Sequence, residues 1–250
     1  MHAPVQPPIP PETLLLAYRS GIFPMADERD DPEIFWVEPR MRAILPLDGF
    51  HCSRSLAKTL RQDRYEVTCN TAFDRVIAAC AQVRPDHPGS WISHRIEDSY
   101  NALHRAGHAH SLECWRDGEL VGGLYGVAFD RVFCGESMFS RADNASKVAL
   151  AWLVVCLRHA GGRVLDCQFM TDHLASLGAI EMTQGDYLAL VRTAQDGEAH
   201  VPDGYSSVLS AASSAAGGVD SAVCASSSAR AAATSSSPGK YIAQFLTHTS

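Results

Sequence analysis

Three polar side chains lie in stretches that otherwise have the composition of buried strands. Glu136 occurs in "CGESMFS" (134–140), and Asp166 and Gln168 occur in "LDCQF" (165–169). Residues two apart on a strand face the same side, so Asp166 and Gln168 are expected to share a face, near Glu136 if the sheet brings it there. Two carboxylates and an amide suit the binding and deprotonation of a cationic amine. The alternative for each carboxylate is a structural ion pair or a helix cap.

Cys167 lies between Asp166 and Gln168 and has the side chain of a nucleophile, for which His173 could act as the base. Alternation along the strand places Cys167 on the face opposite Asp166 and Gln168. This placement favours packing over catalysis for Cys167.

The sequence predicts no metal site and no cofactor. His104, His108, His110 and Glu113 span a helix end, a break and a strand, which implies no fixed ligand geometry. The turn "SRADNASK" (140–147) precedes a predicted helix, where an acyltransferase would cradle the pyrophosphate of CoA, but it has no glycine to allow close backbone approach. The helix N-terminus remains available to another anion, such as an RNA phosphate or a terminal carboxylate.

A group of basic residues precedes the first of these strands. Three of them recur at i, i+4 and i+7 of a helix predicted over about 53–63, and two lie just upstream. The group consists of Arg40, Arg42, Arg54, Lys58 and Arg61. It is either a solvated helix face or a surface that binds RNA phosphates.

Trp36 and Trp91 lie beside predicted loops rather than within long apolar elements. Buried packing is the usual role of tryptophan. The alternative is a stacking platform for a nucleobase.

The order of elements predicts an α+β fold. Short strands and the basic helix form a small N-terminal mixed α/β domain over 1–63, followed by a larger domain over 64–205 that contains an antiparallel meander, a long helix, a strand and a helix. This order is typical of the GNAT-like acyltransferases, although fold alone does not assign function. Ser and Ala dominate residues 206–240, which predicts a disordered linker before a C-terminal segment, 241–250.

Composition narrows the class of protein further. The chain has 250 residues, 46% hydrophobic residues and a net charge of −7, which argues against coating nucleic acid through bulk charge. Eight cysteines include no C-x-x-C pair, and the start "MHAPVQPPIPP" has neither the basic nor the apolar region of a signal peptide. We therefore expect a cytoplasmic protein with reduced thiols.

Taken together, these stretches resemble the leucyl/phenylalanyl-tRNA–protein transferases. The resemblance covers about residues 12–193, and the combination of GESMFS, NASK and DCQ makes it specific. The matching strings are "YRSGIFPM" (18–25), "FDRVIAACA" (73–81), "WI" (91–92), "YNALHRAGHAHSLECW" (100–115), "LVGGLYGVA" (120–128), "FCGESMFSRADNASKVAL" (133–150), "LDCQF" (165–169) and "HLASLGA" (173–179).

The resemblance implies an enzyme that moves Leu or Phe, and less readily Met, from aminoacyl-tRNA to the N-terminal Arg or Lys of a protein. The product would be marked for N-degron proteolysis. The aminoacyl ester is already activated, so neither ATP, metal nor CoA is needed. No membrane or DNA partner is implied.

The resemblance also implies roles for individual residues. Asp166 and Gln168 would orient and deprotonate the acceptor amine, with Glu136 as a second acidic residue at the reaction centre. The basic group from Arg40 to Arg61 would bind tRNA. The implied substrate-binding residues are Trp36, Trp91 and Tyr100 at the aminoacyl-adenosine end and Leu124, Phe133, Met138, Leu150 and Leu153 around the aminoacyl side chain.

Three other functions remain as alternatives. The glycine-free turn argues against a CoA-dependent N-acetyltransferase. A binding module for RNA would not require Glu136 and Asp166 within strands. A transferase that moves Leu onto acidic N-termini belongs to a different sequence group.

Overall fold

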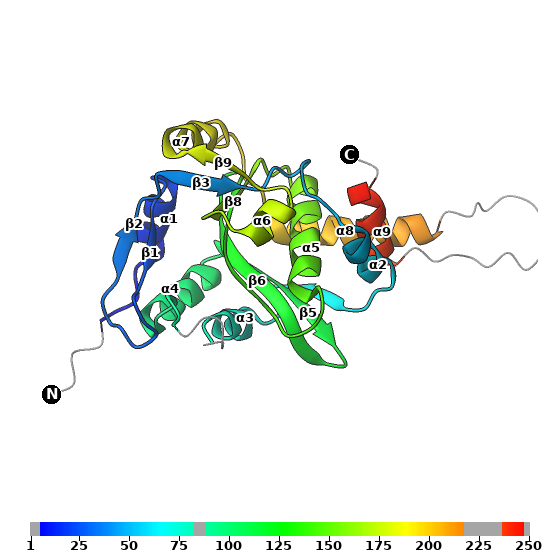
Figure 1. Ribbon diagram of the computed structural model, residues 1–250, viewed down its shortest axis with the longest axis horizontal. Helices are drawn as coiled ribbons and strands as arrows, with labels where there is room; N and C mark the ends of the chain where they lie inside the picture. Colours follow the sequence, from blue (N-terminus) through cyan, green and yellow to red (C-terminus); the bar gives the residue numbers. More distant parts are fainter. Residues whose placement is uncertain (1–5, 83–88, 218–236, 248–250) are drawn as a thin grey trace, which may run out of the picture.

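Figure 1 shows the computed structural model, which describes residues 6–82, 89–217 and 237–247. These residues form a mixed α+β fold. The strands are β1 (Phe23–Met25), β2 (Phe35–Val37), β3 (Met41–Ile44), β4 (Glu66–Cys69), β5 (Ala109–Arg116), β6 (Glu119–Phe129), β7 (Val132–Ser140), β8 (Val164–Gln168) and β9 (Ile180–Thr183). The helices are α1 (Pro11–Arg19), α2 (Arg54–Arg61), α3 (Phe73–Cys80), α4 (His94–Arg105), α5 (Ala145–His159), α6 (Asp172–Ser176), α7 (Gln184–Thr193), α8 (Val201–Gly217) and α9 (Pro238–Thr247).

A seven-stranded mixed sheet organises the fold, with strand order β4-β5-β6-β7-β8-β3-β9. The predicted meander is confirmed, because β5, β6 and β7 pair antiparallel in succession. Strands β7 and β8 are parallel, and α5 connects them. A parallel pair needs such a crossover, whereas the antiparallel pairs need only short turns.

Each face of the sheet is covered by its own layer of helices. One apolar core joins the sheet to α2, α5, α8 and α9, and the other joins it to α1, α3, α4 and α7. Figure 1 displays the two groups on opposite sides of β6. The sheet is therefore buried on both faces, which explains the nearly continuous apolar run in β6.

A β-bulge interrupts the pairing of β6 with β7. Tyr125 faces Ser137 and Gly126 faces Gly135, so Glu136 has no residue opposite it. Gly126 is required here, because a Cβ at this position would lie 2.2 Å from the carbonyl oxygen of Cys134. The bulge changes the direction in which β7 presents Glu136.

The structure does not separate residues 1–63 from the rest of the chain as we expected. Strand β3 lies inside the main sheet, between β8 and β9, and α2 packs on α5 and α9. Strands β1 and β2 form a separate two-stranded sheet beside α1. Backbone pairing of β3 with strands more than a hundred residues later joins the two parts.

The expectation of a disordered linker over 206–240 is wrong where it can be compared with the structure. Helix α8 continues to Gly217 and packs on α5, with Val201, Val208 and Ala212 buried, and residues 237–240 belong to or adjoin α9. Residues 218–236 lie outside the described part of the chain. The C-terminal segment also packs on the core, because Ile242 is buried in α9. In the described residues, no helix has the length and apolar character needed to span a membrane.

Candidate active site

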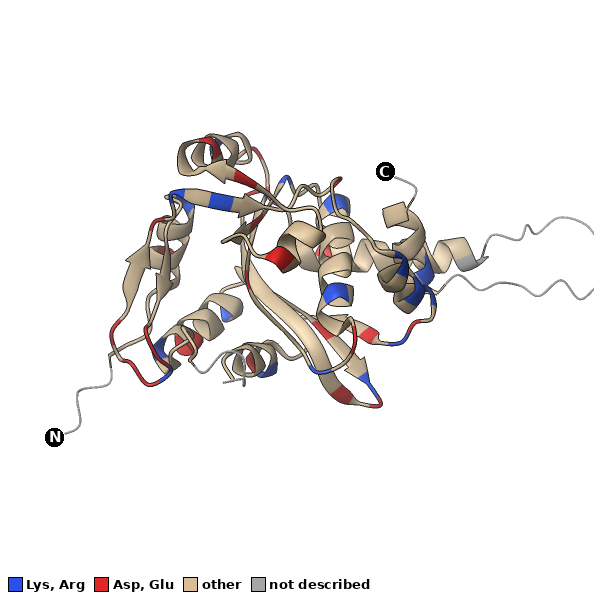
Figure 2. Ribbon diagram, in the orientation of Figure 1, with Lys and Arg blue, Asp and Glu red and all other residues tan. Residues whose placement is uncertain are grey.

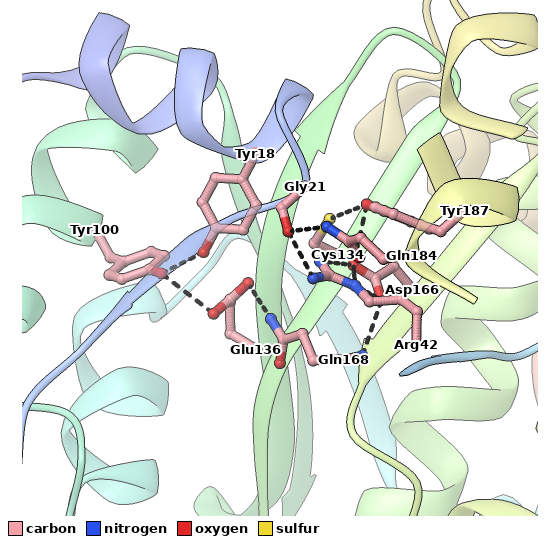
Figure 3. Close-up of polar contacts among 10 residues, drawn as sticks. All are labelled: Tyr18, Gly21, Arg42, Tyr100, Cys134, Glu136, Asp166, Gln168, Gln184 and Tyr187. Carbon is pink, nitrogen blue, oxygen red and sulfur yellow. Dashed lines mark hydrogen bonds and ion pairs between the residues drawn. The ribbon is translucent and has the colours of Figure 1, made fainter. Parts of the chain in front are cut away.

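Glu136 lies at the centre of a buried hydrogen-bond chain (Figure 3). The Tyr100 hydroxyl donates to Oε2 of Glu136 over 3.2 Å, and Nε2 of Gln168 donates to Oε1 over 2.8 Å. Tyr100 also forms a hydrogen bond with Tyr18, a residue of α1 that the sequence did not single out. Burial raises the pKa of Glu136 to about 8. Removal from water thus disfavours the charged carboxylate at this position.

Asp166 is fully buried, and both of its carboxylate oxygens are already occupied. Nε of Arg42 lies 2.9 Å from Oδ1, and Nη2 of Arg42 lies 2.5 Å from Oδ2. The Tyr187 hydroxyl donates to Oδ2 over 3.2 Å, and the backbone N–H of Gln168 donates to Oδ1 over 2.8 Å. Asp166 has the geometry of a residue that fixes its neighbours, because the carboxylate has no unoccupied oxygen facing an incoming amine.

The prediction that Arg42 binds tRNA is wrong for this structure. Arg42 is fully buried, its guanidinium forms the ion pair with Asp166, and Nη1 donates to the carbonyl oxygen of Gly21 over 3.0 Å. The guanidinium carbon also lies 4.4 Å from the centre of the Tyr187 ring. The sequence reveals that Arg42 is basic but not that β3 is an interior strand.

Gln168 connects the two acidic residues. It ends β8 in the left-handed region, at a φ of 61°, where its backbone N–H reaches Asp166 and its side-chain amide reaches Glu136. The expected grouping of these three residues is therefore confirmed. The sequence did not predict the left-handed conformation of Gln168. A regular strand would not place the backbone N–H of Gln168 on the carboxylate of Asp166.

An apolar cavity of about 420 Å³ adjoins Glu136. Its walls include five of the predicted substrate-binding residues: Trp91, Leu124, Met138, Leu150 and Leu153. Leu165 and Leu174 also line the cavity, although neither was predicted from the sequence. Leu165 lies two residues before Cys167, so alternation along the strand "VLDCQ" places both on the same face and could have identified Leu165.

Three predicted substrate-binding residues lie elsewhere. Phe133 is fully buried in the core and does not line the cavity. Tyr100 does not line the cavity, but its hydroxyl donates to Glu136, which does. Trp36 lies on β2, is 41% exposed and does not line the cavity.

Cys167 also lines the cavity, but its thiol is not activated. Burial raises its pKa to about 12, so the thiol stays protonated at neutral pH. Burial lowers the pKa of His173, another residue of the cavity wall. These properties agree with a packing role for Cys167.

The basic residues of α2 lie on its exposed face. Ser53 begins the helix by accepting a hydrogen bond from the N–H of Leu56 over 3.2 Å. The exposed face carries Arg54, Lys58 and Arg61 (Figure 2). Arg40 is exposed as well. Within residues 6–82, 89–217 and 237–247, none of these four cations forms an ion pair with a carboxylate.

Comparisons with known proteins agree over most of the chain. A model of the leucyl/phenylalanyl-tRNA protein transferase family matches residues 44–192, and a model of the N-terminal domain of that family matches residues 8–40. A leucyl/phenylalanyl-tRNA–protein transferase from Novosphingobium aromaticivorans is 58% identical, and the match covers 97% of each chain. This match includes α8, so the C-terminal region has a counterpart.

Two further relatives carry the same name. The protein from Rhizorhabdus wittichii is 61% identical over 74% of this chain and 75% of its own length. The protein from Zymomonas mobilis is 57% identical over 74% of this chain and 69% of its own length. Among solved structures, L-PGS from Bacillus licheniformis matches with a TM-score of 0.36 and 14% identity, covering 66% of this chain and 55% of that chain.

The occupied carboxylates, the apolar cavity and the basic helix thus occur in a chain that matches one family from residue 8 to residue 192 and one relative over nearly its whole length. This protein belongs to the leucyl/phenylalanyl-tRNA–protein transferase family and is an aminoacyltransferase.

Proposed function

We propose that this protein transfers Leu or Phe, and less readily Met, from aminoacyl-tRNA to the N-terminal Arg or Lys of acceptor proteins. The new peptide bond would mark the acceptor for N-degron proteolysis in the cytoplasm. Membership of the family supports transfer from tRNA to protein, and the acceptor and amino-acid preferences are part of the proposal. A GNAT-like C-terminal fold is also proposed, supported by the order of β5, β6, β7, α5 and β8.

The observation that carries the proposal is the apolar cavity beside Glu136. Four uncharged apolar residues line the part of the cavity that would hold the aminoacyl side chain: Leu124, Met138, Leu150 and Leu153. They can contact a branched or unbranched aliphatic side chain or an aromatic ring. Such a wall discriminates between apolar side chains by only about 1–3 kcal/mol per methylene. Overlapping acceptance of Leu, Phe and Met is the expected consequence. Trp91, on the same wall, is suited to stack on the terminal adenosine of the tRNA.

The reaction requires an amine to attack an ester carbonyl. The nitrogen forms a bond to the carbonyl carbon, the bond to the ribose oxygen breaks, and the released hydroxyl takes up one proton. The N-terminal amine has a reference pKa of about 8, so part of it arrives as ammonium and must lose a further proton. The mechanism therefore needs a group that orients the amine and a group that accepts this proton.

Gln168 and Glu136 are suited to these two tasks. The side-chain N–H of Gln168 is bound to Glu136, which leaves the amide oxygen to accept a hydrogen bond from the amine. Burial raises the pKa of Glu136 to about 8, near that of the amine. An adjacent ammonium group favours the ionised form of Glu136, and only that form can accept the proton that the ammonium loses. Asp166, with both oxygens occupied, holds Gln168 in position through its backbone N–H.

The test is transfer of labelled Leu or Phe from charged tRNA to a peptide that begins with Lys or Arg. We expect transfer to these peptides and little transfer to the same peptide beginning with Asp or with an acetylated residue. The variant Gln168→Ala should lower kcat at least about tenfold with little change in tRNA affinity, because it removes a contact made at the amine. Folded protein that transfers no amino acid to Lys- or Arg-starting peptides would refute the proposed function.

A further inference from the structure

A basic hollow lies at the surface beside α2 and the start of α5. It has a volume of about 400 Å³ and is walled by Arg64, Arg116 and Arg141, together with Tyr65, Ala142 and Asp143. Arg64 lies in the loop between α2 and β4, Arg116 ends β5, and Arg141 directly follows β7. Residues far apart in the sequence therefore line one hollow. We call this site the arginine hollow.

Hydrogen bonds fix the shape of the arginine hollow. Tyr65 is buried, and its hydroxyl donates to the backbone oxygen of Asp143 over 2.7 Å. Nη1 of Arg141 donates to the carbonyl oxygen of Leu120 over 3.3 Å, and Nη2 donates to Oε1 of Gln82 over 2.8 Å. The guanidinium carbon lies 5.2 Å from the centre of the Phe139 ring. Tyr65 and Arg141 are thus held in place by the protein itself, which lowers the entropy cost of binding a ligand.

The charge of the arginine hollow favours an anion. Its lining residues include three arginines and one acidic residue, Asp143, which is exposed to solvent. Across the described part of the chain, Arg64, Arg116 and Arg141 form no ion pair with any carboxylate. The protein as a whole carries a net charge of −7, so this concentration of positive charge does not follow from composition.

The arginine hollow continues the basic face of α2. Arg64 follows Arg61 by three residues, and Figure 2 shows basic residues both on α2 and on the segment that follows it, where acidic residues alternate with them. The side-chain amide of Asn144, at the start of α5, reaches Ser55 and Thr59 of α2 over 3.4 and 3.3 Å. The loop that forms one wall is therefore attached to the basic helix itself.

We propose that the arginine hollow binds backbone phosphates of the donor tRNA. It would extend the RNA contact from α2 across the N-terminal end of α5, whose buried residues Leu150 and Leu153 line the aminoacyl cavity. Arginine matches phosphate through bidentate hydrogen bonds, and phosphate contacts orient an RNA without reading its sequence. This inference rests on the proposed function, because it assigns a second contact for the same tRNA.

The test compares two double variants with equal changes in net charge. Arg64→Gln/Arg116→Gln removes two cations of the arginine hollow and leaves Arg141, which supports the loop, unchanged. Arg163→Gln/Arg192→Gln removes two exposed cations on other parts of the surface and serves as the matched control. Arg54→Gln/Lys58→Gln/Arg61→Gln reports the contribution of α2. Affinity for uncharged tRNA is measured over a series of salt concentrations, and circular dichroism checks folding.

We expect Arg64→Gln/Arg116→Gln to weaken tRNA binding about tenfold and to reduce the slope of log K against log salt by about 1 to 2. The ratio of transfer from leucyl-tRNA to transfer from leucyl-adenosine, which has no phosphate backbone, should fall by a similar factor. The matched control should bind tRNA with wild-type affinity and slope.

Equal affinity and slope for Arg64→Gln/Arg116→Gln and the matched control would overturn the inference. If both double variants lost affinity for tRNA to the same extent, the loss would come from the change in net charge and not from the arginine hollow. That result would also overturn the inference. The proposed function fails separately, if the wild-type protein does not transfer Leu or Phe from tRNA to peptide.

Discussion

Glu136 is an acidic residue whose surroundings disfavour its charged form. The bulge and the surrounding side chains remove it from water, and burial disfavours the charged carboxylate. Hydrogen bonds from Tyr100 and Gln168 compensate only in part. An ammonium group beside Glu136 would favour ionisation, so binding of the substrate and transfer of its proton become linked at one residue.

This environment predicts an unusual dependence of stability on pH. A carboxyl group whose pKa rises from 4.5 when unfolded to about 8 when folded keeps its proton longer in the native state. The free energy of unfolding therefore falls as pH rises from about 4.5 to about 8, by at most about 1.4 kcal/mol per pH unit from this residue. Glu136→Gln should remove this part of the decline.

Urea unfolding of the two proteins at several pH values between 5 and 8 measures the effect. The wild-type protein should lose stability relative to Glu136→Gln as pH rises. Curves that run parallel across this range would contradict the raised pKa of Glu136.

At the scale of elements, the pairing of β3 with β8 positions the acidic centre. Backbone hydrogen bonds bring β3 beside β8, and Arg42 then neutralises Asp166, which lies 124 residues away in the chain. A buried ion pair contributes little net stability, but removal of one partner leaves the other charge without compensation. The pair thus makes the position of β8 depend on β3.

Arg42→Met should therefore destabilise the protein by about 3–5 kcal/mol, because Asp166 would remain buried as an unpaired charge. Arg42→Met/Asp166→Asn should cost less than the sum of the two single variants. Arg40→Met, at an exposed position just before β3, serves as the control and should change stability by less than about 0.5 kcal/mol. Chemical denaturation measures all four, and additive single-variant effects would argue against the coupling.

At the scale of the whole molecule, the C-terminal helices join the part of the chain that carries the basic face. Helix α9 packs on α2, α5 and α8. Asp63, two residues after α2 ends, accepts a hydrogen bond from the N–H of Gly239 over 2.9 Å and another from the Ser237 hydroxyl. The side chain of Asp63 thus accepts a hydrogen bond from a backbone N–H in the first turn of α9 that has no partner within the helix. Asp63 and Gly239 are 176 residues apart in the sequence.

Loss of this cap should destabilise the molecule. We expect Asp63→Ala to lower the free energy of unfolding by about 1–2 kcal/mol, with a smaller effect for Asp63→Asn, which keeps an acceptor and tolerates the left-handed φ of 45°. Asp48→Ala, at an exposed acidic position, is the matched control. Thermal unfolding ranks the variants, and equal stability of Asp63→Ala and wild type would show that the cap contributes nothing.

Local patterns in the sequence were sufficient to predict most elements. Helical periodicity indicated α2 and α5, and strand alternation with a turn indicated β5 to β7, because these patterns depend on residues a few positions apart. The strings around Glu136 and Gln168 were likewise sufficient to predict that these residues belong together. Helix α8 had such a pattern too: Val201, Tyr205, Val208 and Ala212 recur at helical spacing, although the Ser- and Ala-rich composition indicated disorder.

Only the tertiary structure decided what the individual charges do. Arg42 and Arg54 are the same residue type and were assigned to one basic group, yet one is buried against Asp166 and the other is exposed on α2. The arginine hollow likewise combines residues from three separate segments. The physical reason is that secondary structure follows from interactions between near neighbours, whereas burial, and with it pKa and charge pairing, depends on which distant strands pair and which helices cover them.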